Sequence, residues 1–135
     1  MGLKEISTYI IIIIIAITMS HYMNVISSGS MEPVLYKGDV VIIDYNPSTI
    51  ETGDIIIYDA RWFQNKHIIH RVIAKGESTD GNIIYILKGD NNADQDPEPI
   101  SPTDVIAKVV TINNHTLIIP KIGYITLWFQ GNTKY

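Results

Sequence analysis

Residue types that can perform nucleophilic and acid–base chemistry gather in three polar clusters along the chain. The first is the run 27–33, Ser-Ser-Gly-Ser-Met-Glu-Pro, in which the hydroxyl of Ser30 could act as a nucleophile. The second contains His70, and a histidine is the natural base for a serine near neutral pH. The third is the acidic run 88–96, where a carboxylate could orient the histidine. No cluster decides the chemistry alone, but together they supply a nucleophile, a base and an orienting acid.

Each cluster also has an ordinary structural interpretation. Serines before a proline are common in loops, a single strand histidine is more often a hydrogen-bonded structural residue, and an acidic run is usually a solvated loop. The position of Ser30 favours the catalytic interpretation, because it closely follows an apolar segment that ends near Val25. A nucleophile placed there would work at a membrane surface.

A metal site is not expected from these clusters. The run that starts at Asp90 resembles a calcium-binding loop at its first positions, but Gln95 and Ser101 stand where that loop requires Gly and Glu. His67 and His70 have an odd spacing along a predicted strand, so they face opposite sides and cannot readily bind one metal. The chain also has no cysteine, which removes thiolate ligands. We therefore expect no metal and no cofactor.

Composition limits the class of protein. A chain of 135 residues has the length of one domain, and 46% hydrophobic against 18% charged residues is enough to form a small core. The net charge is −4 and no basic stripe is present, so nucleic acid is not an expected partner. The absence of cysteine excludes a disulfide framework and a cysteine nucleophile.

The segment 8–26 predicts a transmembrane anchor helix, preceded by a short cytoplasmic tail at residues 1–7. The segment is rich in isoleucine, contains no Asp, Glu, Lys or Arg, and has the length of about 30 Å that crosses a hydrocarbon core. Two alternatives remain open: a cleaved signal peptide, and a buried strand or helix of a soluble core. Lys4 is offset by Glu5, so charge favours a cytoplasmic N-terminus only slightly.

The remainder of the chain predicts a compact, mostly antiparallel β domain over residues 27–119. Short β-branched runs alternate with turn residues, and Asp80-Gly81-Asn82 predicts a tight turn between two of them. The run 91–102, rich in proline and acids, predicts a long functional loop. The runs expected to form strands are 40–44, 54–58, 67–74, 83–88, 105–112 and 116–119.

The C-terminal segment 120–135 is apolar and aromatic but is interrupted by Pro120, Lys121 and Gly123. It is too short to span a bilayer. Its aromatic residues suit a membrane interface, and the alternative is a last element that closes the core of the domain.

Four short motifs follow one another along the chain, namely 28–33 (SGSMEP), 38–41 (GDVV), 70–72 (HRV) and 89–92 (GDNN). In this order they resemble the motifs of type I signal peptidases, specifically the archaeal and endoplasmic-reticulum branch. The bacterial branch carries Lys where His70 stands, so the resemblance implies the Ser–His–Asp version of the enzyme. The short spacing from His70 to Asp90 leaves no room for the additional β-domain of the bacterial enzymes. The resemblance also implies a mainly β fold of the signal peptidase/LexA-like type.

The resemblance implies a role for each site residue. Ser30 is implied as the nucleophile, His70 as the general base, and Ser28 as a donor to the oxyanion together with the Ser30 backbone N–H. Two acids match the last motif. By spacing we favour Asp96 as the acid that orients the histidine, with Asp90 as an auxiliary or alternative acid.

The expected function is therefore that of a membrane-anchored serine endopeptidase that removes N-terminal signal peptides from exported preproteins. The expected partners are secretory preproteins, the lipid bilayer and the protein translocation channel. We expect a single-pass protein whose catalytic domain is extracytoplasmic, and the short chain favours an archaeal cell membrane over the ER. Two other functions compete: a LexA-like self-cleaving serine protease, and a non-catalytic membrane-tethered β module of a processing complex.

Overall fold

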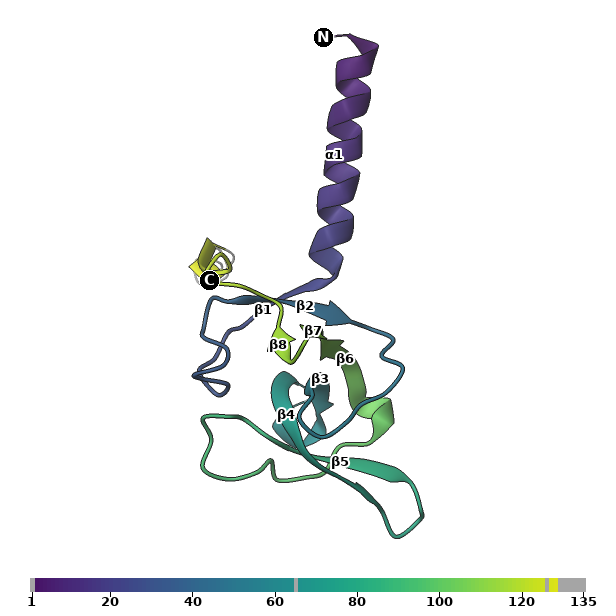
Figure 1. Cartoon of the computed structure of the whole chain (residues 1–135), viewed down its shortest axis with the longest axis vertical. Helices are drawn as coiled ribbons and strands as arrows, with labels where there is room; N and C mark the ends of the chain where they lie inside the picture. Colours follow the sequence, from purple (N-terminus) through teal and green to yellow (C-terminus); the bar gives the residue numbers. More distant parts are fainter. Residues whose placement is uncertain (1, 65, 126, 129–135) are drawn as a thin grey trace.

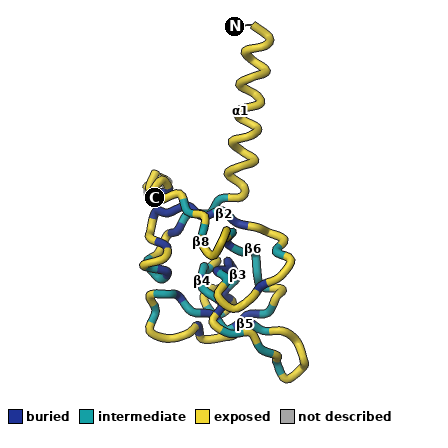
Figure 2. Tube along the Cα trace, viewed as in Figure 1, coloured by how far each residue is buried: buried dark blue, intermediate teal, exposed yellow. Residues whose placement is uncertain are grey.

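An exposed N-terminal helix rises from one end of a β domain in the computed structural model, which describes residues 2–64, 66–125 and 127–128 (Figure 1). Helix α1 spans Leu3–His21, and it begins where the backbone N–H of Gly2 donates a 2.9 Å hydrogen bond to the Glu5 carboxylate. None of its residues is buried, whereas the buried residues gather in the β domain (Figure 2). Its 19 residues are long and apolar enough to cross a membrane. A helix exposed along its whole length is not the core element of a soluble domain.

The helix starts and ends earlier than the predicted anchor. Residues 3–7, expected as a tail, are helical, and Met23–Val25, expected as helix, form strand β1. The backbone of β1 pairs with strand β2, Val40–Asp44, with Met23 opposite Ile42. These pairings satisfy the backbone of residues 23–25 in the sheet, so the long-range partner overrides the apolar helical pattern.

The β domain is built on one antiparallel sheet of seven strands in the order β1-β2-β6-β3-β4-β5, with β9 paired to β2. A two-stranded ribbon of β7 and β8 lies outside it. The expected mainly β fold is confirmed, and the tight turn at Gly81 joins β4 to β5. The remaining elements are β3 (Ile55–Ala60), η1 (Arg61–Phe63), β4 (Lys66–Glu77), β5 (Ile83–Lys88), η2 (Pro102–Asp104), β6 (Val105–Val109), β7 (Thr111–Ile112), β8 (His115–Thr116) and β9 (Ile118–Ile119).

Strand β3 divides the core into two clusters because its side chains alternate between the faces of the sheet. Ile55 and Ile57 enter the first core cluster, and Ile56 and Tyr58 enter the second. The first core cluster is Ile26, Met31, Leu35, Val41, Ile43, Ile55, Ile57, Ala107 and Val109. The second core cluster is Ile50, Ile56, Tyr58, Ala60, Val72, Tyr85, Leu87 and Ile100. Because β3 is buried on both faces of the sheet, its first residues form a continuous apolar run and do not alternate with polar ones.

The described part of the C-terminal segment packs against β1 and the turn that precedes β2. The N–H of Gly123 bonds to the carbonyl of Gly38 at 2.9 Å, and a Cβ on Gly123 would lie 2.5 Å from the side chain of Val25. Gly38 has φ +89°, and a Cβ there would lie 2.6 Å from the ring of Tyr124. Residues 126 and 129–135 of the predicted 120–135 segment lie outside the described residues.

Candidate active site

The loop after β1 carries Ser30, and apolar side chains of the same loop fix it to the core. Met31 and Leu35 are both fully buried in the first core cluster. Burial of each such side chain stabilises the fold by about 1.5–3 kcal/mol. The Ser28 hydroxyl lies 3.2 Å from the Ser30 hydroxyl, so two of the predicted site residues are in contact.

A buried histidine–aspartate pair lies beside the second core cluster. His70 precedes Val72 by two residues along β4 and therefore faces the same side of the sheet as that cluster. Its Nδ1 atom is 2.9 Å from both carboxylate oxygens of Asp96, and the two side chains are 6% and 4% exposed. The long loop that carries Asp96 is tied to β5 by a 2.8 Å bond from the Asp96 N–H to the Leu87 carbonyl. The structure thus brings the histidine to the acid that the sequence favoured.

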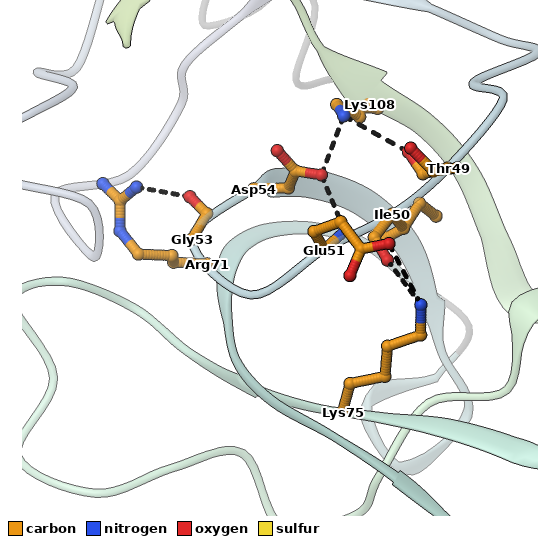
Figure 3. A network of polar contacts seen from close by, with 8 residues as sticks. All are labelled: Thr49, Ile50, Glu51, Gly53, Asp54, Arg71, Lys75 and Lys108. Carbon is orange, nitrogen blue, oxygen red and sulfur yellow. Dashed lines mark hydrogen bonds and ion pairs between the residues drawn. The ribbon is translucent and has the colours of Figure 1, made fainter.

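Asp90, the other predicted acid, lies with a different partner. Its two oxygens accept hydrogen bonds of 2.8 and 2.6 Å from Nε and Nη2 of Arg71. The third nitrogen of the guanidinium donates 2.8 Å to the carbonyl of Gly53 in the turn before β3 (Figure 3). Hydrogen bonding to Asp90 raises the pKa of Arg71, against the smaller opposing effect of partial burial. Asp90 therefore joins β4, β5 and a turn and makes no hydrogen bond to His70.

The residues around Asp90 also fix the serine loop, a role that the sequence reasoning missed. The Asn91 N–H donates 2.8 Å to the Ser30 carbonyl, and the Asn91 side-chain amide donates 3.0 Å to the Gly29 carbonyl. A Cβ on Gly89 would stand only 2.6 Å from the same Ser30 carbonyl oxygen. Glycine is required at this position because the two loops touch through their backbones.

Tyr58 is a second residue that the sequence reasoning missed. Its hydroxyl donates a hydrogen bond to Oδ2 of Asp96 and lies 3.4 Å from Nδ1 of His70. Tyr58 has no exposed surface. Burial, the hydrogen bond to Asp96 and the nearby charge of Asp96 all raise the pKa of this phenol far above its ordinary value. The only sequence signal was a lone hydroxyl-bearing aromatic directly after three isoleucines of the same strand.

A pocket of about 370 Å³ opens between the serine loop and β4. Ser30 and His70 both line it, together with the aliphatic side chains of Ile57 and Ile69. The Ser30 hydroxyl and the His70 ring are not hydrogen-bonded to each other in the described part of the chain, which is common for catalytic groups before substrate binds. Among the described residues no group of three or more His, Cys, Asp or Glu could hold a metal ion. A hydroxyl and an imidazole that line one pocket, with a buried carboxylate bonded to the imidazole, can perform acyl transfer.

Comparison with known proteins gives matches over most of the chain. Residues 2–82 match the family model described as signal peptidase, peptidase S26. An uncharacterized protein of Methanocaldococcus jannaschii is 26% identical, with 87% of this chain and 88% of that protein covered. The signal peptidase complex catalytic subunit SEC11 of Lachancea thermotolerans is 33% identical over 82% of this chain and 67% of its own length. SEC11 of Plasmodium falciparum is 33% identical over 78% of this chain and 57% of its own length.

Proposed function

Since the chain belongs to peptidase family S26 and is a signal peptidase, we propose that Ser30, His70 and Asp96 are the triad with which it removes signal peptides. The observation that carries this proposal is the buried 2.9 Å contact between His70 and Asp96 beside the pocket that Ser30 lines. The ion pair of Asp90 with Arg71 supports a structural role for that acid. A LexA-like self-cleaving protease is set aside by the family match.

In the proposed reaction, Ser30 Oγ attacks the carbonyl carbon of the scissile peptide bond while Nε2 of His70 takes the hydroxyl proton. The tetrahedral intermediate collapses, and His70 returns this proton to the leaving amine. A water molecule then attacks the acyl-enzyme and gives a proton to His70, and His70 passes that proton to Ser30 Oγ as the ester bond breaks. Asp96 accepts the hydrogen bond from Nδ1 and stabilises the imidazolium at each stage.

The oxyanion is the second requirement of this chemistry. Ser28 Oγ lies beside Ser30 Oγ at 3.2 Å, so its hydroxyl is near the atom that attacks. We assign the Ser28 hydroxyl and the Ser30 backbone N–H as the oxyanion donors. Loss of one such donor typically lowers the rate by about 10²–10³-fold.

The apolar helix α1 would hold the enzyme at a membrane. We assign α1 as a single-pass anchor with a cytoplasmic N-terminus and an extracytoplasmic β domain. The C-terminal segment lies at the end of the domain from which α1 rises (Figure 1), and its Ile122, Ile125 and Trp128 are 54%, 65% and 63% exposed. Aromatic and aliphatic side chains in this place suit the membrane interface, and we propose that they lie in it.

The substrates of a signal peptidase carry a signal peptide, and its apolar region of about 7–15 residues would hold the scissile bond near the interface. We propose the protein translocation channel as a further partner. The match to a Methanocaldococcus jannaschii protein over 87% of this chain and 88% of that protein supports an archaeal cell membrane over the ER.

The anchor assignment is tested on the mature protein. Mass spectrometry should detect residues 1–21 in the mature chain, and alkaline extraction should leave the chain in the membrane pellet. A chain cleaved after α1 would identify that segment as a signal peptide instead.

The test of the triad is cleavage of a preprotein by the full chain in detergent or liposomes, with the new N-terminus identified by mass spectrometry. Ser30→Ala should lower the rate by more than about 10³-fold, since the nucleophile is lost. Ser48→Ala is the control, because Ser48 is exposed in the loop between β2 and β3 and does not line the pocket. Retained cleavage by folded Ser30→Ala protein would refute the nucleophile. A folded wild type that cleaves no preprotein would favour a non-catalytic module.

A further inference from the structure

The Asp96 carboxylate has a second buried partner besides the histidine. Nδ1 of His70 lies 2.9 Å from each carboxylate oxygen, so the histidine by itself does not select one of them. The Tyr58 hydroxyl donates to Oδ2 of the same group. A buried carboxylate needs donors to offset the loss of its water shell, and each additional donor favours its ionised form. Tyr58 supplies the one side-chain donor to Asp96 other than the histidine among the described residues.

The Tyr58 hydroxyl can donate only one hydrogen bond, and the two distances indicate which group accepts it. The contact with Asp96 Oδ2 is much closer than the 3.4 Å to Nδ1 of His70. A tyrosine that donates to the carboxylate leaves the imidazole as the donor on its own Nδ1 side. Nε2, the other ring nitrogen, is then free of its proton and can accept one from Ser30.

Strand pairing fixes the tyrosine in this place. Tyr58 lies on β3 opposite Ile68 of β4, and Ile56 lies opposite His70. Its ring is fully buried in the second core cluster and its centroid is 6.3 Å from that of the imidazole. Because the pKa of Tyr58 is raised by burial and by Asp96, its hydroxyl keeps its proton at neutral pH. A buried donor that stays protonated there is suited to orienting a carboxylate.

We propose that Tyr58 is a positioning residue of the catalytic centre, which holds Asp96 ionised and oriented so that His70 presents an unprotonated Nε2 to Ser30. This inference rests on the proposed triad and adds a fourth residue, on a different strand, that acts through Asp96. It makes the efficiency of the base depend on a hydroxyl that does not contact substrate.

The test replaces only this hydroxyl. Tyr58→Phe keeps the ring and its packing, and Tyr85→Phe is the matched control. Tyr85 is 5% exposed in the same second core cluster, and its hydroxyl has no hydrogen-bond partner in the described part of the chain. We expect Tyr58→Phe to lower kcat by about tenfold to hundredfold through misplacement of the base, with KM close to that of the wild type. Tyr85→Phe should keep the wild-type kcat.

The pH profile separates positioning from a merely structural role. Without the tyrosine donor, the charge of Asp96 is stabilised less by the protein and attracts the imidazolium proton more strongly. The acid limb of kcat/KM, which reports protonation of the base in the free enzyme, should therefore move to higher pH in Tyr58→Phe and stay in place in Tyr85→Phe. A variant that is only less stable would show a lower unfolding temperature and an unchanged limb.

Ser30→Ala belongs in the same assay. An inactive Ser30→Ala beside a Tyr58→Phe with wild-type kcat and an unmoved acid limb would overturn the role of Tyr58 and leave the triad intact. Equal losses in Tyr58→Phe and Tyr85→Phe would also overturn it. Full activity of Ser30→Ala would overturn the triad itself.

Discussion

Two neighbouring residues of β4, His70 and Arg71, each pair with an aspartate from the chain that follows β5, and the two pairs differ in burial and partner. His70 and Asp96 have side chains 6% and 4% exposed, whereas those of Arg71 and Asp90 are 29% and 17% exposed. Adjacent strand residues point to opposite faces of the sheet. One step along the strand therefore separates a buried imidazole–carboxylate pair from a partly solvated ion pair.

The comparison indicates what each pair can do. A histidine gains and loses a proton near neutral pH, so its pair can take part in proton transfer. The pKa of Arg71 is raised by Asp90 above a value that is already very high, so the ion pair contributes to stability at neutral pH. On the alkaline side, that contribution would be lost as pH rises through the raised pKa, far above neutral. The bidentate ion pair of Arg71 and Asp90 thus holds β4, the end of β5 and the turn at Gly53 together.

The largest effect should follow from a change in the buried pair. Asp96→Asn keeps the shape of the side chain but removes the charge and favours the wrong tautomer of His70, so kcat should fall by about 10³–10⁴-fold. Preprotein cleavage measures this loss, and circular dichroism checks the fold. Asp94→Asn is the matched control, because Asp94 is exposed in the same loop. Activity within about tenfold of wild type in Asp96→Asn would contradict the assignment of the two pairs.

An intermediate effect should follow from a change at the contact between the loops. Gly89→Ala places a Cβ 2.6 Å from the Ser30 carbonyl oxygen, so the loop that carries Ser30 must shift. Displacement of the proposed nucleophile by about 1 Å can cost about 10²-fold in kcat. Gly81→Ala is the control for strain in a turn away from the site, since a Cβ there meets no atom within 4 Å although its φ is +75°. Wild-type kcat in Gly89→Ala would show that the segment directly after β5 does not position Ser30.

The smallest catalytic effect is expected at the ion pair. Asp90→Asn removes the charge that faces Arg71 and should lower the free energy of unfolding by about 1–3 kcal/mol, as for hydrogen bonds to charged groups. We expect kcat to fall by no more than about tenfold, because the triad is intact. Chemical denaturation and the cleavage assay give the two numbers. A loss of activity as large as that of Asp96→Asn, in folded protein, would move the catalytic role to Asp90.

Much of the fold could be predicted from the sequence because it depends on local patterns. The runs 40–44 and 83–88 form strands with the expected bounds, and the turn at Gly81 follows from its residue types. The end of α1 could not be predicted. Residues 23–25 continue the uncharged segment without a helix-breaking residue, and their pairing with β2 makes them a strand.

The site shows the same division. The order of Ser30, His70 and the two acids could be read along the chain, because the motifs that carry them are short. The partner of each acid could not, since Asp90 and Asp96 are close in sequence and either could reach β4. Tyr58 and Asn91 were missed because their contacts join residues far apart in the chain and leave no local signal.

The sequence by itself determined the apolar segment, the strand-forming runs and the residue types for serine peptidase chemistry, because composition and spacing act locally. The tertiary structure decided the rest. Alternation along β4 sends His70 and Arg71 to opposite faces, and the loop after β5 then delivers Asp96 to one and Asp90 to the other. Burial follows from that placement, and burial makes one pair suited to moving protons and the other to holding strands together.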